Sequence, residues 1–330
     1  MTSLTRRQWL VGTAAAAALP LVATAPARAV PPQSGQQAPG FYRYKLGSFE
    51  ITVVTDGKSR VPITDDFVAN AKKSEVQAAL AALFMDTEIF YGPYNPIVVN
   101  TGANLVAIDT GNGEAAYRNT KGLNGQYLVN LAAAGINAAD IDTVVISHYH
   151  GDHINGLLRA DGSLAFPNAR IRVPAAEHRY WMSDEEMKRA PTARIEFLFK
   201  NARRVMSGEV LKRVTTYEWD EEVVPGIRAV ATPGQSPGHT SHIVSSGGKS
   251  VFVHADVTHA PYLFVRNPGW HAYYDHDPVK SEETRRKVLD MLASTRMPVQ
   301  GYHFPFPGLA YIEKTATGYR EVPVQWDPLI

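Results

Sequence analysis

The chain has 330 residues, of which 45% are hydrophobic and 20% are charged, and its formal net charge is +1. A chain of this length can bury a sizeable core, and the near-neutral charge argues against a nucleic-acid partner. Cysteine is absent, which excludes disulfides, thiolate nucleophiles and thiolate metal ligands, so any metal ion must be held by His, Asp and Glu.

The N-terminal segment has the pattern of an export signal. Residues 5–10 read TRRQWL, an alanine-rich apolar stretch follows, and residues 27–29 form a small-x-small cleavage site. We predict a twin-arginine signal peptide over residues 1–29, cleaved after Ala29, that exports the folded protein to the periplasm or beyond the cell. A retained membrane anchor is the alternative. Because Pro20 interrupts the apolar stretch, we expect no stable membrane association after cleavage.

The segment after the signal begins with a short linker. Residues 30–40 are rich in Pro, Gln and Gly and are predicted to be a flexible lead-in to one domain over residues 41–330. Apolar runs and helical spacing then predict elements in chain order. The predicted strands are 41–46, 49–55, 97–100 and 105–108, and the predicted helices lie within 65–90 and over 117–134. Segment 65–95 is expected to form either a lid or an arm of a homodimer.

A histidine-rich run follows the next predicted strand, residues 143–146. It reads SHYHGDH. Alternate residues at a strand end point to the same side, so His148 and His150 can bind one ion. The chain then turns, and Asp152 and His153 can face a second ion. Neutral imidazole and carboxylate are ligands that zinc prefers, so this run predicts a metal site.

The second half of the chain repeats the alternation of strands and helices. Strands are predicted over 169–173, 227–231, 242–245, 250–254 and 299–302. Helices are predicted over 175–182, over 185–205 with a break near Pro191, and over 281–294. Strands interleaved with helices in two halves predict an α/β layered sandwich.

Three later positions complete a ligand set. All eleven histidines follow residue 147. His239 lies in a Pro-Gly loop, Asp256 ends an apolar strand, and His303 ends another strand. Side chains at strand ends and in loops along one edge of a sheet form binding sites in many folds.

The order of these residues resembles that of the metallo-β-lactamase superfamily: H-x-H-x-D-H, then P-G-H-T, then Asp after a strand and a late His. An upstream D-T-G that starts at Asp109 also matches. The resemblance covers residues 41–326 and implies an αβ/βα four-layer sandwich with two divalent ions, most simply Zn²⁺. It further implies that one ion is bound by His148, His150 and His239, that the other is bound by Asp152, His153 and His303, and that Asp256 bridges them.

The resemblance also implies a hydrolase that acts on a small molecule, and the predicted signal peptide adds that it is exported. A hydroxide shared by two ions would attack a carbonyl carbon or a phosphorus atom, with Asp152 and Asp256 as catalytic residues that hold the ions and orient the nucleophile. Residues 49–52, 166–169 and 303–308 are most similar to methyl parathion hydrolase-like and quorum-quenching lactonase enzymes. A lactone, ester or phosphotriester substrate follows from that similarity. Residues 257–277 differ from those enzymes and are expected to line the substrate pocket.

Other interpretations stay open at this level. The same site could hydrolyse a β-lactam or a thioester, and the chain could be a periplasmic metal-binding protein without activity. Asp109 either orients a ligand histidine or is a turn residue. His254 is equally balanced between a supporting and a structural role, and His259 is expected to be structural. Several aromatic residues either form a pocket or pack in the core: Tyr91, Tyr94, Phe264, Trp270, Tyr273 and Tyr274.

Overall fold

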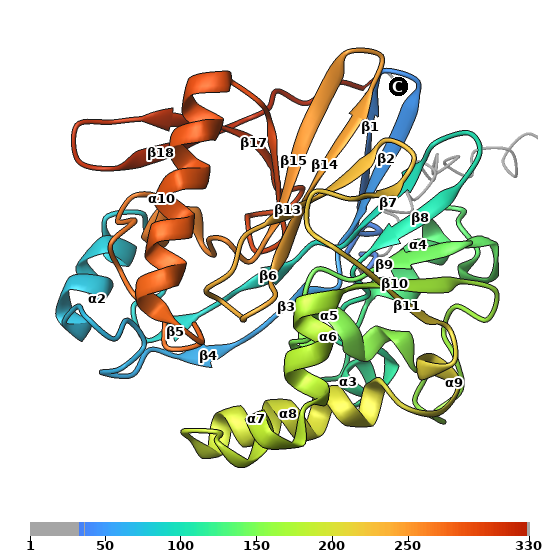
Figure 1. Ribbon diagram of the computed structural model, residues 1–330. Coiled ribbons are helices and arrows are strands. Elements are labelled where there is room, and N and C mark those ends of the chain that lie inside the picture. Colours follow the sequence, from blue (N-terminus) through green and yellow to red (C-terminus); the bar gives the residue numbers. More distant parts are fainter. Residues whose placement is uncertain (1–32, 36, 329–330) are drawn as a thin grey trace, which may run out of the picture. The chain divides into compact units, whose positions relative to one another are not determined.

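Two seven-stranded mixed sheets form the centre of the computed structural model, which describes residues 33–35 and 37–328 (Figure 1). The predicted signal peptide lies outside these residues. In spatial order, the first sheet contains β1 (Phe41–Leu46), β2 (Phe49–Val54), β7 (Ile97–Asn100), β8 (Leu105–Ile108), β9 (Thr143–Val145), β10 (Arg170–Pro174) and β11 (Val214–Tyr217). The second contains β12 (Glu222–Val224), β13 (Ile227–Ala231), β14 (Thr240–Ser246), β15 (Lys249–Ala255), β16 (Val299–Gly301), β17 (Leu309–Lys314) and β18 (Tyr319–Pro323).

Helical crossovers decide which neighbouring strands are parallel. Strands β1, β2, β7 and β8 pair antiparallel, whereas β8 through β11 pair parallel because helices connect them. In the second sheet only β15 and β16 pair parallel. Their connection contains the π-helical turn η3 (Pro261–Val265) and α10 (Pro278–Thr295).

The remaining helical segments are short and lie mainly between strands of the first sheet. They are α2 (Lys73–Ala81), α3 (Glu114–Asn119), α4 (Tyr127–Ala133), η1 (Ala138–Asp140), α5 (Gly151–Ile154), η2 (Asn155–Leu157), α6 (Ala175–Met182), α7 (Asp184–Lys188), α8 (Ala193–Val205) and α9 (Gly208–Leu211). No helix in the described part of the chain has the length and apolar character that crossing a membrane requires.

Both faces of each sheet are buried, which creates four layers. On β8, Val106 joins an apolar cluster between the two sheets, whereas the next residue, Ala107, packs in a cluster with α6 and α8. On the far side, Leu289 of α10 packs with Phe252 of β15. Figure 1 shows α10 on one side of the sheets and α4, α6 and α8 on the other. The predicted four-layer sandwich is therefore confirmed.

The helix predicted over residues 117–134 is wrong, because the structure does not have a single helix there. The segment 117–134 contains the end of α3, a turn and then α4. Lys121 and Gly122 have φ of 54° and 83°, and Gly125 has φ of 76°. A Cβ atom at Gly125 would lie 2.4 Å from the carbonyl oxygen of Gly113, so this close turn requires glycine and ends the helix.

Residues 57–94 form an arm beside the second sheet. Two small sheets pair β3 (Gly57–Lys58) with β6 (Pro93–Tyr94) and β4 (Val61–Pro62) with β5 (Ile89–Phe90). Within the predicted helical segment 65–90, only α2 is a regular helix. Phe67 and Leu80 of the arm pack with Leu263 and Phe264 of η3 in an apolar cluster.

Candidate metal centre

The predicted ligand residues come together from both sheets, in loops that follow the ends of strands. His148, His150, Asp152 and His153 follow β9, His239 lies between β13 and β14, and Asp256 and His303 follow β15 and β16. Helix α5 starts at Gly151, so Asp152 and His153 occupy its first turn. All of these residues are buried except Asp152, whose side chain is 22% exposed. The folded chain therefore gathers residues more than 150 positions apart.

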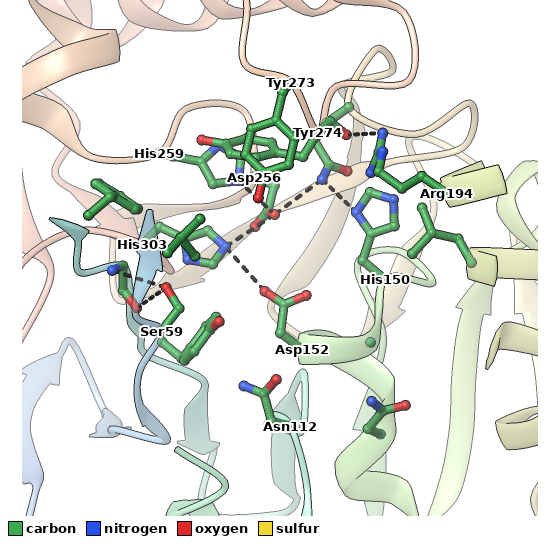
Figure 2. A pocket seen from close by; sticks show the side chains of 18 of the residues that line it. Ser59, Asn112, His150, Asp152, Arg194, Asp256, His259, Tyr273, Tyr274 and His303 are labelled. Atoms are coloured by element: carbon green, nitrogen blue, oxygen red, sulfur yellow. Dashed lines mark hydrogen bonds and ion pairs between the residues drawn. The ribbon is translucent and has the colours of Figure 1, made fainter. Parts of the chain in front are cut away.

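Asp256 lies at the middle of this group (Figure 2). Its Oδ1 atom is 3.1 Å from His153 Nε2, and its Oδ2 atom is 3.2 Å from His303 Nε2 and 3.7 Å from His148 Nε2. Two sets of side chains are close enough to hold an ion each: Asp152, His153, Asp256 and His303 in one, and His148, His150 and Asp256 in the other. Asp256 belongs to both sets, as a bridging ligand would.

His239 lies next to the second set but is not part of it. Its ring centroid is 4.9 Å from that of His148. Its Nε2 atom, however, accepts a hydrogen bond of 3.0 Å from the backbone N–H of Asp256. The structure thus places His239 beside the position expected from the sequence, with its Nε2 atom turned to the backbone.

Each histidine is oriented through its Nδ1 atom. His153 Nδ1 contacts Asp109 Oδ2 at 2.8 Å, and His303 Nδ1 contacts the Pro93 carbonyl oxygen at 2.9 Å. The remaining Nδ1 contacts are His148 with Ser147 Oγ at 3.0 Å, His150 with Gln235 Nε2 at 2.6 Å, and His239 with the Thr232 carbonyl oxygen at 2.9 Å. Oxygen acceptors on Nδ1, as at His153 and His303, fix the rings of metal-binding histidines and leave Nε2 for an ion. At His150 the Gln235 amide N–H donates to Nδ1 instead, and at His239 the Asp256 N–H occupies Nε2.

The unpaired atoms fit divalent metal ions. The Nε2 atoms of His148, His150 and His153 and the Oδ1 atom of Asp256 are buried and have no hydrogen-bond partner. Orphaned buried polar atoms are costly and call for an explanation. Three imidazole nitrogens and one carboxylate oxygen without a hydrogen-bond partner in the described part of the chain suit ions of the zinc type.

Burial and charge shift the pKa values in this group. Burial lowers the pKa of His148 and His150 well below the ordinary value, which keeps both rings neutral and able to bind metal. Burial would raise the pKa of Asp256, but His153 and His303 outweigh it and hold that pKa well below its usual range. Asp256 is therefore an anion.

The structure decides the role of Asp109. Besides His153, it accepts hydrogen bonds from the backbone N–H and the Oγ–H of Ser147, at 2.8 and 2.7 Å. Its φ is 61°, a left-handed conformation. Asp109 thus orients a candidate ligand and the start of the metal loop, rather than only forming a turn.

Glu177 of α6 is a supporting residue that the sequence analysis missed. It is fully buried and accepts four hydrogen bonds. Tyr149 N–H and Trp181 Nε1–H donate to Oε1 at 2.9 and 2.6 Å, and Ser236 Oγ–H and Gly238 N–H donate to Oε2 at 2.8 and 2.7 Å. One carboxylate therefore joins the loop of His148 and His150 to the loop of His239. The sequence placed Glu177 in the predicted helix over 175–182, but a glutamate in a helix is ordinarily expected to face solvent.

His259 is closer to the centre than expected. Its Nε2 atom is 3.1 Å from Asp256 Oδ2, and its ring stacks on His303 with centroids 4.5 Å apart. Its position three residues after Asp256 was the signal that could have placed it there. His254 has a structural environment, because its Nδ1 atom contacts the Ala255 carbonyl oxygen and its ring packs against Phe304.

A pocket of about 260 Å³ opens onto Asp152, Asp256 and His303. Of the six aromatic residues considered from the sequence, Tyr94, Tyr273 and Tyr274 line it. Phe264 is fully buried in the apolar cluster of the arm, and Tyr91 and Trp270 do not line the pocket. Segment 65–95 contributes Phe67 and Phe90 to the pocket wall, so the arm forms part of the site.

Comparison with known families agrees with this geometry. The model of the metallo-beta-lactamase superfamily matches residues 90–298, and the chain belongs to that superfamily. The match covers parts of both sheets, from Phe90 at the end of β5 to the last residue before β16, and leaves out β1, β2, β16, β17 and β18. The superfamily predicted from the ligand order is thereby confirmed.

Similar proteins include an N-acyl homoserine lactonase from Bacillus sp., 28% identical over 164 residues, which are 45% of this chain and 57% of that protein. The chain thus spans little more than half the length of the curated relatives it matches. Among solved structures, the hydrolase AbOPH has a TM-score of 0.81 at 26% identity, with 88% of this chain and 100% of the other covered. AidC, a dizinc quorum-quenching lactonase, has a TM-score of 0.77 at 26% identity, with 87% and 98% covered.

Proposed function

We propose that the protein is an exported dinuclear metal hydrolase that opens lactones. The observation that carries the proposal is the pair of ligand sets that share Asp256, with the Nε2 atoms of His148, His150 and His153 buried and without a hydrogen-bond partner among the described residues. The named activities of the N-acyl homoserine lactonases and AidC support a lactone as the substrate class. Zn²⁺ is the proposed metal.

The residues present suit this chemistry. When bound, two such ions lower the pKa of a water molecule and polarise the oxygen of the scissile ester. Asp256 and Asp152 would hold the ions, and the partly exposed Asp152 faces the pocket where the substrate must enter. His148 and His150 would bind one ion, with His239 beside them, and His153 and His303 would bind the other. Phe67, Phe90 and Tyr273 supply an apolar wall that excludes water.

A substrate panel tests the proposal. We expect zinc-loaded protein to bind two ions and to hydrolyse a homoserine lactone with higher kcat/KM than an aryl ester, methyl parathion, nitrocefin or a thioester. His148→Ala and Asp256→Ala should each lower kcat/KM by roughly a hundredfold or more, since each removes a metal ligand. Removal of metal with a chelator should abolish activity, and added Zn²⁺ should restore it.

Three results would contradict this function. Near-parental turnover by either variant would show that the metal centre is not catalytic. A dominant nitrocefin or thioester signal would move the enzyme to the alternative substrate class, and metal binding without any turnover would favour the metal-binding protein.

The export part of the proposal has its own test. The full chain, expressed in a bacterium with an active twin-arginine pathway, should be recovered from the periplasm with Val30 as its first residue. Replacement of Arg6 and Arg7 by lysine should retain the protein in the cytoplasm. Recovery of the uncleaved chain in the membrane fraction would support an anchor.

A further inference from the structure

One cation lines the pocket beside the metal centre. Arg194 lies near the start of α8, one turn before Leu198, and both side chains line the same wall. Figure 2 shows the Arg194 side chain near His150, extended toward the backbone of Tyr274. Its Nη2–H group donates a hydrogen bond of 3.1 Å to the Tyr274 carbonyl oxygen.

This guanidinium has no carboxylate partner within 4.0 Å among the described residues. Burial lowers the pKa of Arg194, while Tyr273 and Asp275 raise it. The Asp275 carboxylate pairs instead with Arg285, whose Nη2 atom lies 3.2 Å from its Oδ2 atom. A guanidinium has five N–H donors, so most of those on Arg194 stay available to an acceptor in the pocket.

The arm supplies most of the apolar lining of the pocket. Val61, Phe67 and Phe90 of the arm line it, beside the polar side chains of Ser59 and Tyr94. Arg194 is the only lysine or arginine among the lining residues. A substrate that fills this space therefore needs an oxygen acceptor toward α8 and a hydrocarbon group toward the arm.

We propose that Arg194 is a specificity-determining residue that donates a hydrogen bond to the amide carbonyl oxygen of an N-acyl substituent on the lactone ring. This assignment rests on the lactone hydrolysis proposed above. The scissile ester lies at the metal centre, the amide oxygen meets Arg194, and the acyl chain lies against Val61, Phe67 and Phe90. An alkyl lactone without the amide would fill the apolar wall and leave Arg194 unpaired.

A comparison of two lactones tests the assignment. N-hexanoyl homoserine lactone has the amide, and γ-octanolactone does not. We expect Arg194→Met to lower the ratio of their kcat/KM values by roughly ten- to a hundredfold, the effect of losing a hydrogen bond to a charged group. Arg194→Lys should restore part of the ratio. The matched control is Arg189→Met, an arginine with a 70% exposed side chain that pairs with Glu186, and it should leave the ratio unchanged.

The outcomes separate this inference from the proposed function. An equal loss on both lactones, or no loss on either, would overturn the role of Arg194 while leaving lactone hydrolysis in place. If the parent hydrolyses neither lactone, the proposed function fails. Calorimetric binding of N-hexanoyl homoserine and 4-hydroxyoctanoate to zinc-loaded protein then tests Arg194 directly. The assignment would be overturned if Arg194→Met left the ratio of the two Kd values unchanged. It would also be overturned if the parent bound neither acid.

Discussion

Single buried carboxylates control the geometry of the candidate metal centre. Asp109 holds His153 through Nδ1, and Glu177 holds the backbone on both sides of the site through Tyr149 and Gly238. The fit at Glu177 is close, because a Cβ atom at Gly238 would lie 2.1 Å from the Glu177 nitrogen. Each carboxylate therefore acts on the metal site through a neighbour, and its loss should change metal affinity.

Glu177→Gln tests this positioning role. The amide can accept hydrogen bonds on one side only, so at least one of the four donors is left unpaired. We expect zinc affinity, measured by competition with a chelator, to fall roughly 10- to 100-fold. The control is Glu209→Gln, a glutamate with a 64% exposed side chain that pairs with Lys212. Parental zinc affinity in Glu177→Gln, together with lowered stability, would indicate a purely structural residue.

At the scale of secondary-structure elements, α10 anchors residues 257–275, a segment that lines the pocket. Arg285 is 1% exposed and donates to the carbonyl oxygens of Val257, Pro268 and Trp270 at 3.2, 3.0 and 2.8 Å. It also pairs with the buried carboxylate of Asp275. These contacts tie residues 257–275 to one helix, and Tyr273 and Tyr274 of this segment line the pocket, as expected for 257–277.

Arg285→Met should therefore destabilise the fold. Removal of the guanidinium leaves Asp275 buried without its partner, and breaking such a pair costs about 3–5 kcal/mol. Urea denaturation measures the change. The neighbouring Arg286→Met serves as control, since its side chain is 49% exposed and pairs with Glu282, and it should change stability by about 0.5 kcal/mol or less. Equal effects of the two substitutions would contradict the anchoring role.

At the scale of the whole molecule, buried polar contacts join the two sheets. His242 of β14 lies 3.0 Å from the hydroxyl of Tyr217 of β11, which also donates to the Ile146 carbonyl oxygen at 2.8 Å. Burial lowers the pKa of His242 to about 4. The folded state therefore binds this proton less tightly than the unfolded chain, whose histidine has a pKa near 6.5.

The lowered pKa of His242 sets the direction in which the stability of the protein changes with pH. The contribution of His242 to stability is fully present above pH 6.5 and is lost as the pH falls through about 6.5 toward 4. We expect the parent, in chelator, to lose stability relative to His242→Gln over this range, by up to about 3 kcal/mol. Urea denaturation at several pH values measures the difference. If the free energies of unfolding of the two proteins changed in parallel with pH, the lowered pKa of His242 would be contradicted.

The sequence by itself determined the superfamily, the layered fold and the residues gathered at the centre, because strand periodicity and the spacing of His148, His150, Asp152 and His153 are local properties. The tertiary structure decided what depends on contacts between distant segments. It broke the helix expected over 117–134 at close glycine turns, brought His259 to Asp256, turned His239 Nε2 to the backbone, and placed Glu177 and Arg194 at the site. A lone glutamate or arginine gives no periodic signal in the sequence. Only the packing of α6 and α8 against the metal loops supplies Glu177 with its hydrogen-bond donors and leaves Arg194 without a carboxylate partner among the residues that the structure describes.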